Sequence, residues 1–186
     1  MQRMKRIMSR LSILALLAAS LAAVQGSTLQ QLSLNDLILK STLIVRGSPQ
    51  LNYSQFRGAI IYTHYTIEVS QVYKGLVTTK QLDVAVPGGM TGGMRQVFSG
   101  VPGILNGGDY VFFLWTSKSG LTQIIGLSQG LFTVGKDSSG NFIVQRPAAT
   151  ETMLNVAGQP VNDSLLQMKL GDLLNDIYSV LKAAGQ

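Results

Sequence analysis

The chain offers few side chains that could perform chemistry. His64 is the single histidine among 186 residues, and there is no cysteine. In the alternating run 59–75 the polar face carries His64 together with Glu68, so we expect a solvent-exposed histidine. A hydrolytic triad needs a histidine that is oriented by a carboxylate and reaches a nucleophile, and nothing near His64 resembles a nucleophile elbow. One histidine without cysteine also excludes a zinc site built from the common nitrogen and sulfur ligands.

The acidic side chains are the other candidates for catalysis. A glycosidase needs two carboxylates that face each other across a cleft. The sequence does not indicate which two of the acidic residues would do so. Asp109 follows Gly107 and Gly108, which predicts a turn residue. The segment DSSGN at 137–141 begins like a calcium loop but lacks the later acidic ligand, so it predicts a hairpin turn. We predict no enzyme activity, no metal site and no cofactor. The nine acidic residues are Asp36, Glu68, Asp83, Asp109, Asp137, Glu151, Asp163, Asp172 and Asp176.

A glycine-rich stretch, VPGGMTGGMRQVFSGVPGILNGGDY at 86–110, is the most distinctive segment. A P-loop starting at Gly88 would need lysine where Met94 stands, and a dinucleotide fingerprint must open a helix, whereas a strand pattern follows Gly93. We predict structural glycines that form turns between strands. These are Gly88, Gly89, Gly92, Gly93, Gly100, Gly107 and Gly108. Loops on a rigid scaffold often bind ligands. The candidate binding residues on this rim are Met90, Thr91, Met94, Arg95 and Gln96.

The first 26 residues have the pattern of an export signal. A basic start that includes Arg3 and Arg10 precedes the apolar run 11–24, and small residues surround Gly26. The run is short for a spanning helix of about 20 residues, so we predict a signal peptide cleaved after Gly26 rather than an uncleaved anchor.

Cleavage would remove four of the 15 basic residues and none of the nine acids, which leaves a net charge of +2. The remaining lysines and arginines come singly, which argues against nucleic-acid binding. We therefore predict a secreted or periplasmic protein with no membrane association after cleavage.

The hydrophobic pattern of 27–186 predicts a single domain of mainly β structure. Short strands separated by glycine turns are expected, among them 42–47 and the long run 59–75. The segment 109–117 is apolar on both faces and is expected to be the central strand. Interior Gly126 and Gly130 indicate bends.

Two helical patterns flank these strands. Ser33 is expected to cap a short helix near the start, and an amphipathic helix at about 163–184, capped by Asp163 or Ser164, is expected at the end. The expected fold is a small OB-like antiparallel β-barrel with a short N-terminal helix and a C-terminal amphipathic helix.

Four consecutive segments of the chain form a recognisable pattern: STLIVRGSP, IEVSQVYKG, LDVAVPGGMTGGMRQVFSGVPGILNGGDYVFFL and IIGLSQGLFTV. Over about 32–134 they resemble a family of exported bacterial proteins of uncharacterised function, which in some members accompanies a secreted metalloprotease domain. LIVRG, VYKG and GDYVFFL also resemble, more remotely, netrin-like modules with the OB-type barrel of metalloproteinase inhibitors. Those inhibitors chelate the protease zinc through an N-terminal cysteine, and this chain has none.

The sequence thus favours an exported, non-enzymatic binding or interaction module that binds an extracellular or periplasmic protein or another extracellular ligand. One alternative, indicated by the two resemblances, is a regulator or inhibitor of a secreted protease. A more remote alternative is a hydrolase that uses the scattered acids. The sequence does not indicate the ligand or the oligomeric state.

Overall fold

The computed structural model describes residues 28–186. The predicted export signal, residues 1–26, and its cleavage site after Gly26 lie outside the described residues. The described part is mainly β, with two α-helices. None of its helices is long and apolar enough to cross a membrane.

Eight strands form one large sheet in the order β13-β10-β9-β7-β2-β3-β4, with β8 also paired to β7. The neighbouring strands run antiparallel. β7 is central, as predicted, because β2 follows one of its edges while β8 and β9 share the other. The strands are β2 Leu43–Arg57, β3 Ile60–Lys74, β4 Gln81–Pro87, β7 Tyr110–Thr116, β8 Thr122–Ile124, β9 Leu131–Lys136, β10 Phe142–Arg146 and β13 Leu166–Lys169.

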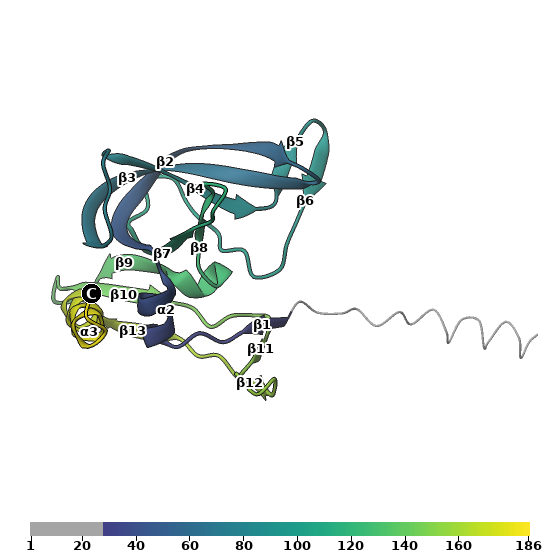
Figure 1. The fold of residues 1–186 in the computed structure, drawn as a ribbon. Helices are drawn as coiled ribbons and strands as arrows, with labels where there is room; N and C mark the ends of the chain where they lie inside the picture. Colours follow the sequence, from purple (N-terminus) through teal and green to yellow (C-terminus); the bar gives the residue numbers. More distant parts are fainter. Residues whose placement is uncertain (1–27) are drawn as a thin grey trace, which may run out of the picture.

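Two smaller sheets and the helices complete the fold (Figure 1). β1 (Thr28–Gln30) pairs in parallel with β11 (Thr152–Leu154), which pairs with β12 (Pro160–Val161). β5 (Gly89–Thr91) and β6 (Met94–Gln96) form a separate hairpin. The helices α2 (Leu34–Lys40) and α3 (Leu170–Ala183) pack together, and a 3₁₀ turn, η1 (Leu127–Gly130), joins β8 to β9.

Consecutive side chains of β2 and β7 enter different hydrophobic cores, because alternate residues of a strand point to opposite faces. Both faces of β7 are therefore buried, which explains its apolar run. The core on the helix side includes Leu37, Ile44, Val111, Phe113, Leu173 and Ile177. The core inside the curled sheet includes Val45, Val84, Val86, Phe112, Leu114 and Ile124.

The large sheet curls but is not closed into a barrel. Among the described strands β4 pairs only with β3. Its other edge approaches β8, and Val86 and Ile124 belong to the same core. The mainly β class is confirmed, whereas the closed, OB-like form of the prediction is not. The parallel pairing of β1 with β11 also departs from a purely antiparallel sheet.

β2 is longer than predicted, since it continues past Gly47 and Pro49 to Arg57. Pro49 is tolerated because β7 pairs with β2 only as far as Gly47, and the β2–β3 register shifts between Pro49 and Leu51. A Cβ on Gly47 would lie 2.6 Å from the Glu68 carbonyl oxygen, so the close approach of β3 requires glycine there.

The C-terminal helix begins at Leu170 and not at 163, which corrects the predicted start. Asp163 does not cap it but pairs with Arg146, and β13 follows before the helix. In contrast, the predicted cap of α2 is confirmed: the Ser33 side chain accepts the Asp36 amide at 3.0 Å in a capping box.

Candidate functional site

The β5–β6 hairpin contains all five candidate binding residues of the glycine-rich stretch. It turns through Gly92 and Gly93, which have φ of +57° and +74°. Positive φ at both central residues is typical of the two-residue type I′ turn, and glycine adopts it without steric cost. The same stretch has positive φ at Gly88, Gly89, Gly100 and Gly107. At Gly108, a Cβ would instead collide with the ring of Tyr110.

The hairpin is fixed to the outer end of the β2–β3 ribbon through Gly88 and Gly89. The Gly88 amide donates to the Ile61 carbonyl at 2.7 Å, and the Thr63 hydroxyl donates to the Gly88 carbonyl at 2.8 Å. The Ser54 hydroxyl lies 2.9 Å from that of Thr63. A Cβ on Gly89 would overlap both hydroxyls, so the hairpin can lie this close only with glycine.

Gln96 fixes the other strand of the hairpin and is therefore a structural residue. Its amide oxygen accepts the Ile61 N–H at 2.7 Å, and its amide nitrogen donates to the Ala59 carbonyl at 2.9 Å. Both partners lie at the turn between β2 and β3. Of the five candidate residues, Gln96 thus holds the scaffold, while Met90 and Arg95 stand opposite each other on the same face of the hairpin.

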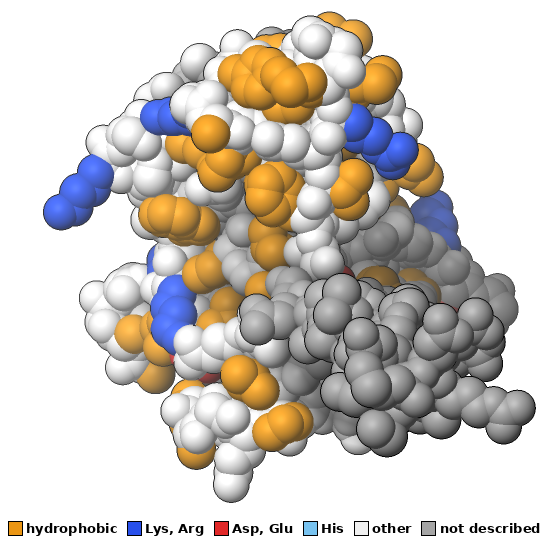
Figure 2. Space-filling model, turned by 90° about the vertical axis from the view of Figure 1, so that its right-hand side faces the viewer, with side chains coloured by type: hydrophobic (Ala, Val, Ile, Leu, Met, Phe, Trp, Pro, Cys, Tyr) orange, Lys and Arg blue, Asp and Glu red, His pale blue; other side chains and the backbone are white. Residues whose placement is uncertain are grey.

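We call β5, β6, the following residues 97–98 and residues 56–60 around the β2–β3 turn the hairpin end. Large apolar side chains are exposed over it: Met90 is 70%, Met94 56% and Val97 75% exposed. Figure 2 shows hydrophobic side chains gathered over the upper part of this face, with lysine and arginine side chains at its sides. The exposed apolar side chains of the hairpin end are Phe56, Ile60, Met90, Met94, Val97 and Phe98.

A small hollow lies between the hairpin end and strands β3 and β4, with a volume of about 260 Å³. Arg95 is the one charged side chain among its lining residues, which otherwise are mostly apolar or glycine. Sequence reasoning missed the apolar part of this region, namely Phe56, Val97 and Phe98. The available signal was the presence of bulky apolar residues next to the turn glycines in FRG and VFSG.

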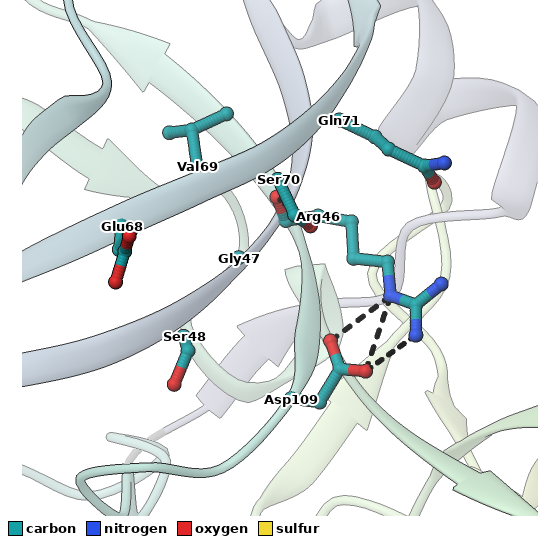
Figure 3. Close-up of a pocket in the computed structure, with 8 residues that line it drawn as sticks. All are labelled: Arg46, Gly47, Ser48, Glu68, Val69, Ser70, Gln71 and Asp109. Carbon is teal, nitrogen blue, oxygen red and sulfur yellow. Dashed lines mark hydrogen bonds and ion pairs between the residues drawn. The ribbon is translucent and has the colours of Figure 1, made fainter.

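A second, larger groove of about 490 Å³ follows the bulge of β2 and is lined mostly by residues with polar side chains (Figure 3). In it Arg46 Nε lies 3.0 Å from Asp109 Oδ1 and Nη2 lies 2.5 Å from Oδ2. The guanidinium also lies 4.7 Å from the centre of the Phe142 ring. The hydrogen-bonded Asp109 raises the pKa of Arg46 above its usual range. Asp109 is thus an ion-pair partner as well as a residue that follows a glycine turn.

His64 is buried, with 5% of its surface exposed, so the predicted solvent-exposed histidine is wrong. The Tyr53 ring on the neighbouring strand stacks on it, with centroids 5.0 Å apart. Its partner is Asp83 and not Glu68: Nδ1 lies 2.8 Å from Asp83 Oδ2, and Nε2 lies 3.2 Å from Gln55 Nε2. A histidine that activates a nucleophile would present Nε2 to a hydroxyl or thiol, and here Gln55 occupies that position.

The segment GLSQG at 126–130 fits the G-x-S-x-G spacing of a nucleophile elbow. The Ser128 hydroxyl is buried and has no hydrogen-bond partner within the described residues. The segment leads from a strand through η1 into another strand and not into an α-helix. Both ring nitrogens of His64 contact Asp83 and Gln55. Among the described residues, no histidine or carboxylate is hydrogen-bonded to the Ser128 hydroxyl.

The GLSQG segment instead anchors the start of the described chain. Gln129 is buried, accepts the Leu32 N–H at 2.8 Å and donates to the Gln30 carbonyl at 3.0 Å. Gly126 and Leu127 both have left-handed φ, of +63° and +56°. A leucine in this region is uncommon and costs about 1–2 kcal/mol.

Within residues 28–186 no group of three or more histidine, cysteine, aspartate or glutamate side chains could hold a metal ion. Comparisons with models of protein families, with curated proteins and with solved structures found no match to the chain.

Proposed function

We propose that this chain is an exported, non-enzymatic binding module that docks a partner protein at the hairpin end. The observation that carries the proposal is the exposure of Met90, Met94 and Val97 on a hairpin whose backbone is fixed from both strands. Clustered exposed apolar side chains mark interaction sites in soluble proteins.

The composition of the hairpin end supports a protein interface. Interface cores are enriched in methionine, aromatic residues and arginine, and the hairpin end contains all three. Methionine side chains adapt to the shape of a partner, whereas the backbone beneath them is held by Gly89 and Gln96. An adaptable surface on a rigid scaffold avoids most of the entropic cost of ordering a loop on binding.

Export and the barrel-like form belong to the same proposal. The basic start and apolar run of residues 1–26 support export by a cleaved signal peptide. The packing of β4 against β8 supports a partly open, OB-like barrel as the scaffold. Because of the resemblance to metalloproteinase-inhibitor barrels, a secreted protease is one of the partners that the experiment tests.

A position-specific cross-linking experiment tests the proposal. Because the chain has no cysteine, Met90→Cys creates a single thiol that benzophenone maleimide labels uniquely. Tyr178→Cys on α3, at a side chain that is 53% exposed, provides the control position. Each labelled protein is irradiated with the secreted and periplasmic fractions of the source cells, and adducts are identified by mass spectrometry.

We expect a discrete adduct from the Met90→Cys probe that the Tyr178→Cys probe does not form. Excess unlabelled wild-type protein should suppress it, and an unlabelled Met90→Ser/Met94→Ser double variant should not. The proposal fails if both positions yield the same adducts, if neither yields one, or if the double variant competes as well as the wild type.

A further inference from the structure

The hollow beside the hairpin end is small for an independent ligand. Small-molecule sites usually span about 300–1,000 Å³, and this hollow has about 260 Å³. Residues of β3 and β4 form the floor of the hollow, and residues that follow β6 form one wall. A space of this size suits a single side chain that a larger partner inserts.

Apolar side chains supply part of the lining, beside Thr63, Tyr65 and Gln96, which carry polar groups. Val86, Pro87, Val97, Phe98 and Val101 line the hollow. Val97 and Phe98 are themselves exposed. A bulky apolar side chain in the hollow would remove these apolar surfaces from water, which favours its binding.

The charged residue at the hollow determines which group of the partner would lie next to that side chain. Within residues 28–186 the structure gives Arg95 no ion pair and no side-chain hydrogen bond. Arg46 and Arg146, in contrast, each bind an aspartate. Glu151 approaches the same segment further along, beside Gly100, but does not line the hollow. Arg95 therefore favours an acidic group on the partner.

Resting on the proposed function, we infer that the hollow receives a bulky apolar side chain from an acidic segment of the partner protein, whose neighbouring carboxylate binds Arg95. The planar guanidinium can bind a carboxylate through two parallel hydrogen bonds. A lipid surface would meet the protruding Met90 and Met94 but would leave a hollow of this shape unfilled, so the geometry favours a peptide segment.

Selection from a displayed library of random peptides tests this inference with the full chain as bait. We expect the enriched peptides to share an aspartate or glutamate next to a phenylalanine, leucine, isoleucine, methionine or tryptophan. Arg95→Glu should weaken their binding about tenfold or more. Lys182→Glu makes the same charge change at an exposed residue of α3 and should leave the binding unchanged. Circular dichroism melting of each variant checks that the fold is intact.

Three results would overturn the inference. Enriched peptides that lack acidic residues would refute the charge, and equal binding by wild type and Arg95→Glu would refute the contact. Binding of phosphatidylcholine–phosphatidylserine vesicles that depends on Arg95, without peptide enrichment, would replace the peptide by a lipid surface. A position-specific adduct at Met90 together with a failed selection would leave the proposed function standing, whereas failure of the cross-linking as well would refute both.

Discussion

Arg146 and Arg95 of the hairpin end have opposite environments: Arg146 is buried in an ion pair, whereas Arg95 is exposed. Arg146 and Asp163 are 5% and 4% exposed, and Arg146 Nη1 and Nη2 lie 2.6 and 3.0 Å from the two carboxylate oxygens. Arg95 lies at the surface of a hairpin rich in exposed apolar groups. The first arginine pairs with a buried carboxylate, whereas we expect the second, which is exposed, to contribute little to folding. The comparison thus predicts that stability and the proposed binding depend on different parts of the molecule.

Removing Arg146 should produce the largest effect. Arg146→Ala would leave Asp163 buried without its counter-charge and should reduce the free energy of unfolding by about 3–5 kcal/mol. Arg95→Ala should change it by less than about 0.5 kcal/mol. Urea titration of the three proteins measures the difference. An Arg146→Met/Asp163→Leu double variant should recover most of the loss; equal effects of Arg146→Ala and Arg95→Ala would abolish the comparison.

Unfolding at acid pH should reveal the contribution of the Arg146–Asp163 pair to stability. The hydrogen bond from Arg146 lowers the pKa of Asp163 to about 2, below the value of about 3.9 for an unfolded aspartate. Its contribution to stability, about 2 kcal/mol, is therefore present above about pH 4 and lost as the pH falls toward 2. Urea midpoints from pH 5 downward should decline more steeply in the wild type than in the Arg146→Met/Asp163→Leu variant.

Asp36 does not obscure this comparison. Lys40 donates a hydrogen bond to the Asp36 carboxylate and also lowers the pKa of Asp36 to about 2. This interaction is present in both proteins. Parallel acid curves for the two proteins would show that the ion pair does not contribute.

Alanine substitutions at two glycines of the hairpin end separate two effects: the packing of the hairpin against the β2–β3 ribbon and the backbone geometry of its turn. Gly89→Ala would place a Cβ against the hydroxyls of Ser54 and Thr63 and should cost about 1–3 kcal/mol. Gly93→Ala, with no atom near the new Cβ, pays only for its left-handed φ, about 1 kcal/mol. Hydrogen exchange of the Gly88 amide should increase in Gly89→Ala. Identical exchange in both variants would mean that the close approach is unimportant.

The smallest expected effect on stability is at the proposed interface. Met90→Ser/Met94→Ser should leave the unfolding free energy within about 0.5 kcal/mol of the wild type, because both side chains are exposed. The same variant should lose the ability to compete in the cross-linking experiment. Thermal melting measures the first property, and a loss of several kcal/mol would show that these methionines belong to the core.

Local patterns made part of this fold predictable. The apolar run of β7, the Ser33 cap and the turn at Asp137 depend on residues close together in sequence, and each was identified correctly. The mainly β class followed from alternation and turn glycines. The C-terminal helix was identified but its start was placed too early, because an apolar period of three and four residues continued into β13.

The long-range pairs were not predictable from a single sequence. Arg46 and Asp109 are 63 residues apart, His64 and Asp83 are 19 apart, and Arg146 and Asp163 are 17 apart. No local rule selects these partners from nine acids and 15 basic residues. The glycine-rich stretch identified the hairpin end, but the hollow required the placement of β3 and β4 beside it. Gln96 was assigned to the rim because the two backbone groups that bind its side chain, on Ile61 and Ala59, are 35 and 37 residues away in the sequence.

The pairing of β1 with β11 has a consequence for the order of folding. The first described strand bonds in parallel to residues 152–154, and Gln129 holds the segment that follows it. Contacts that close such long loops form late. Residues 28–30 can therefore pair with β11 only after residues 152–154 have been synthesised. Until that pairing forms, the first described strand would remain exposed to proteolytic cleavage.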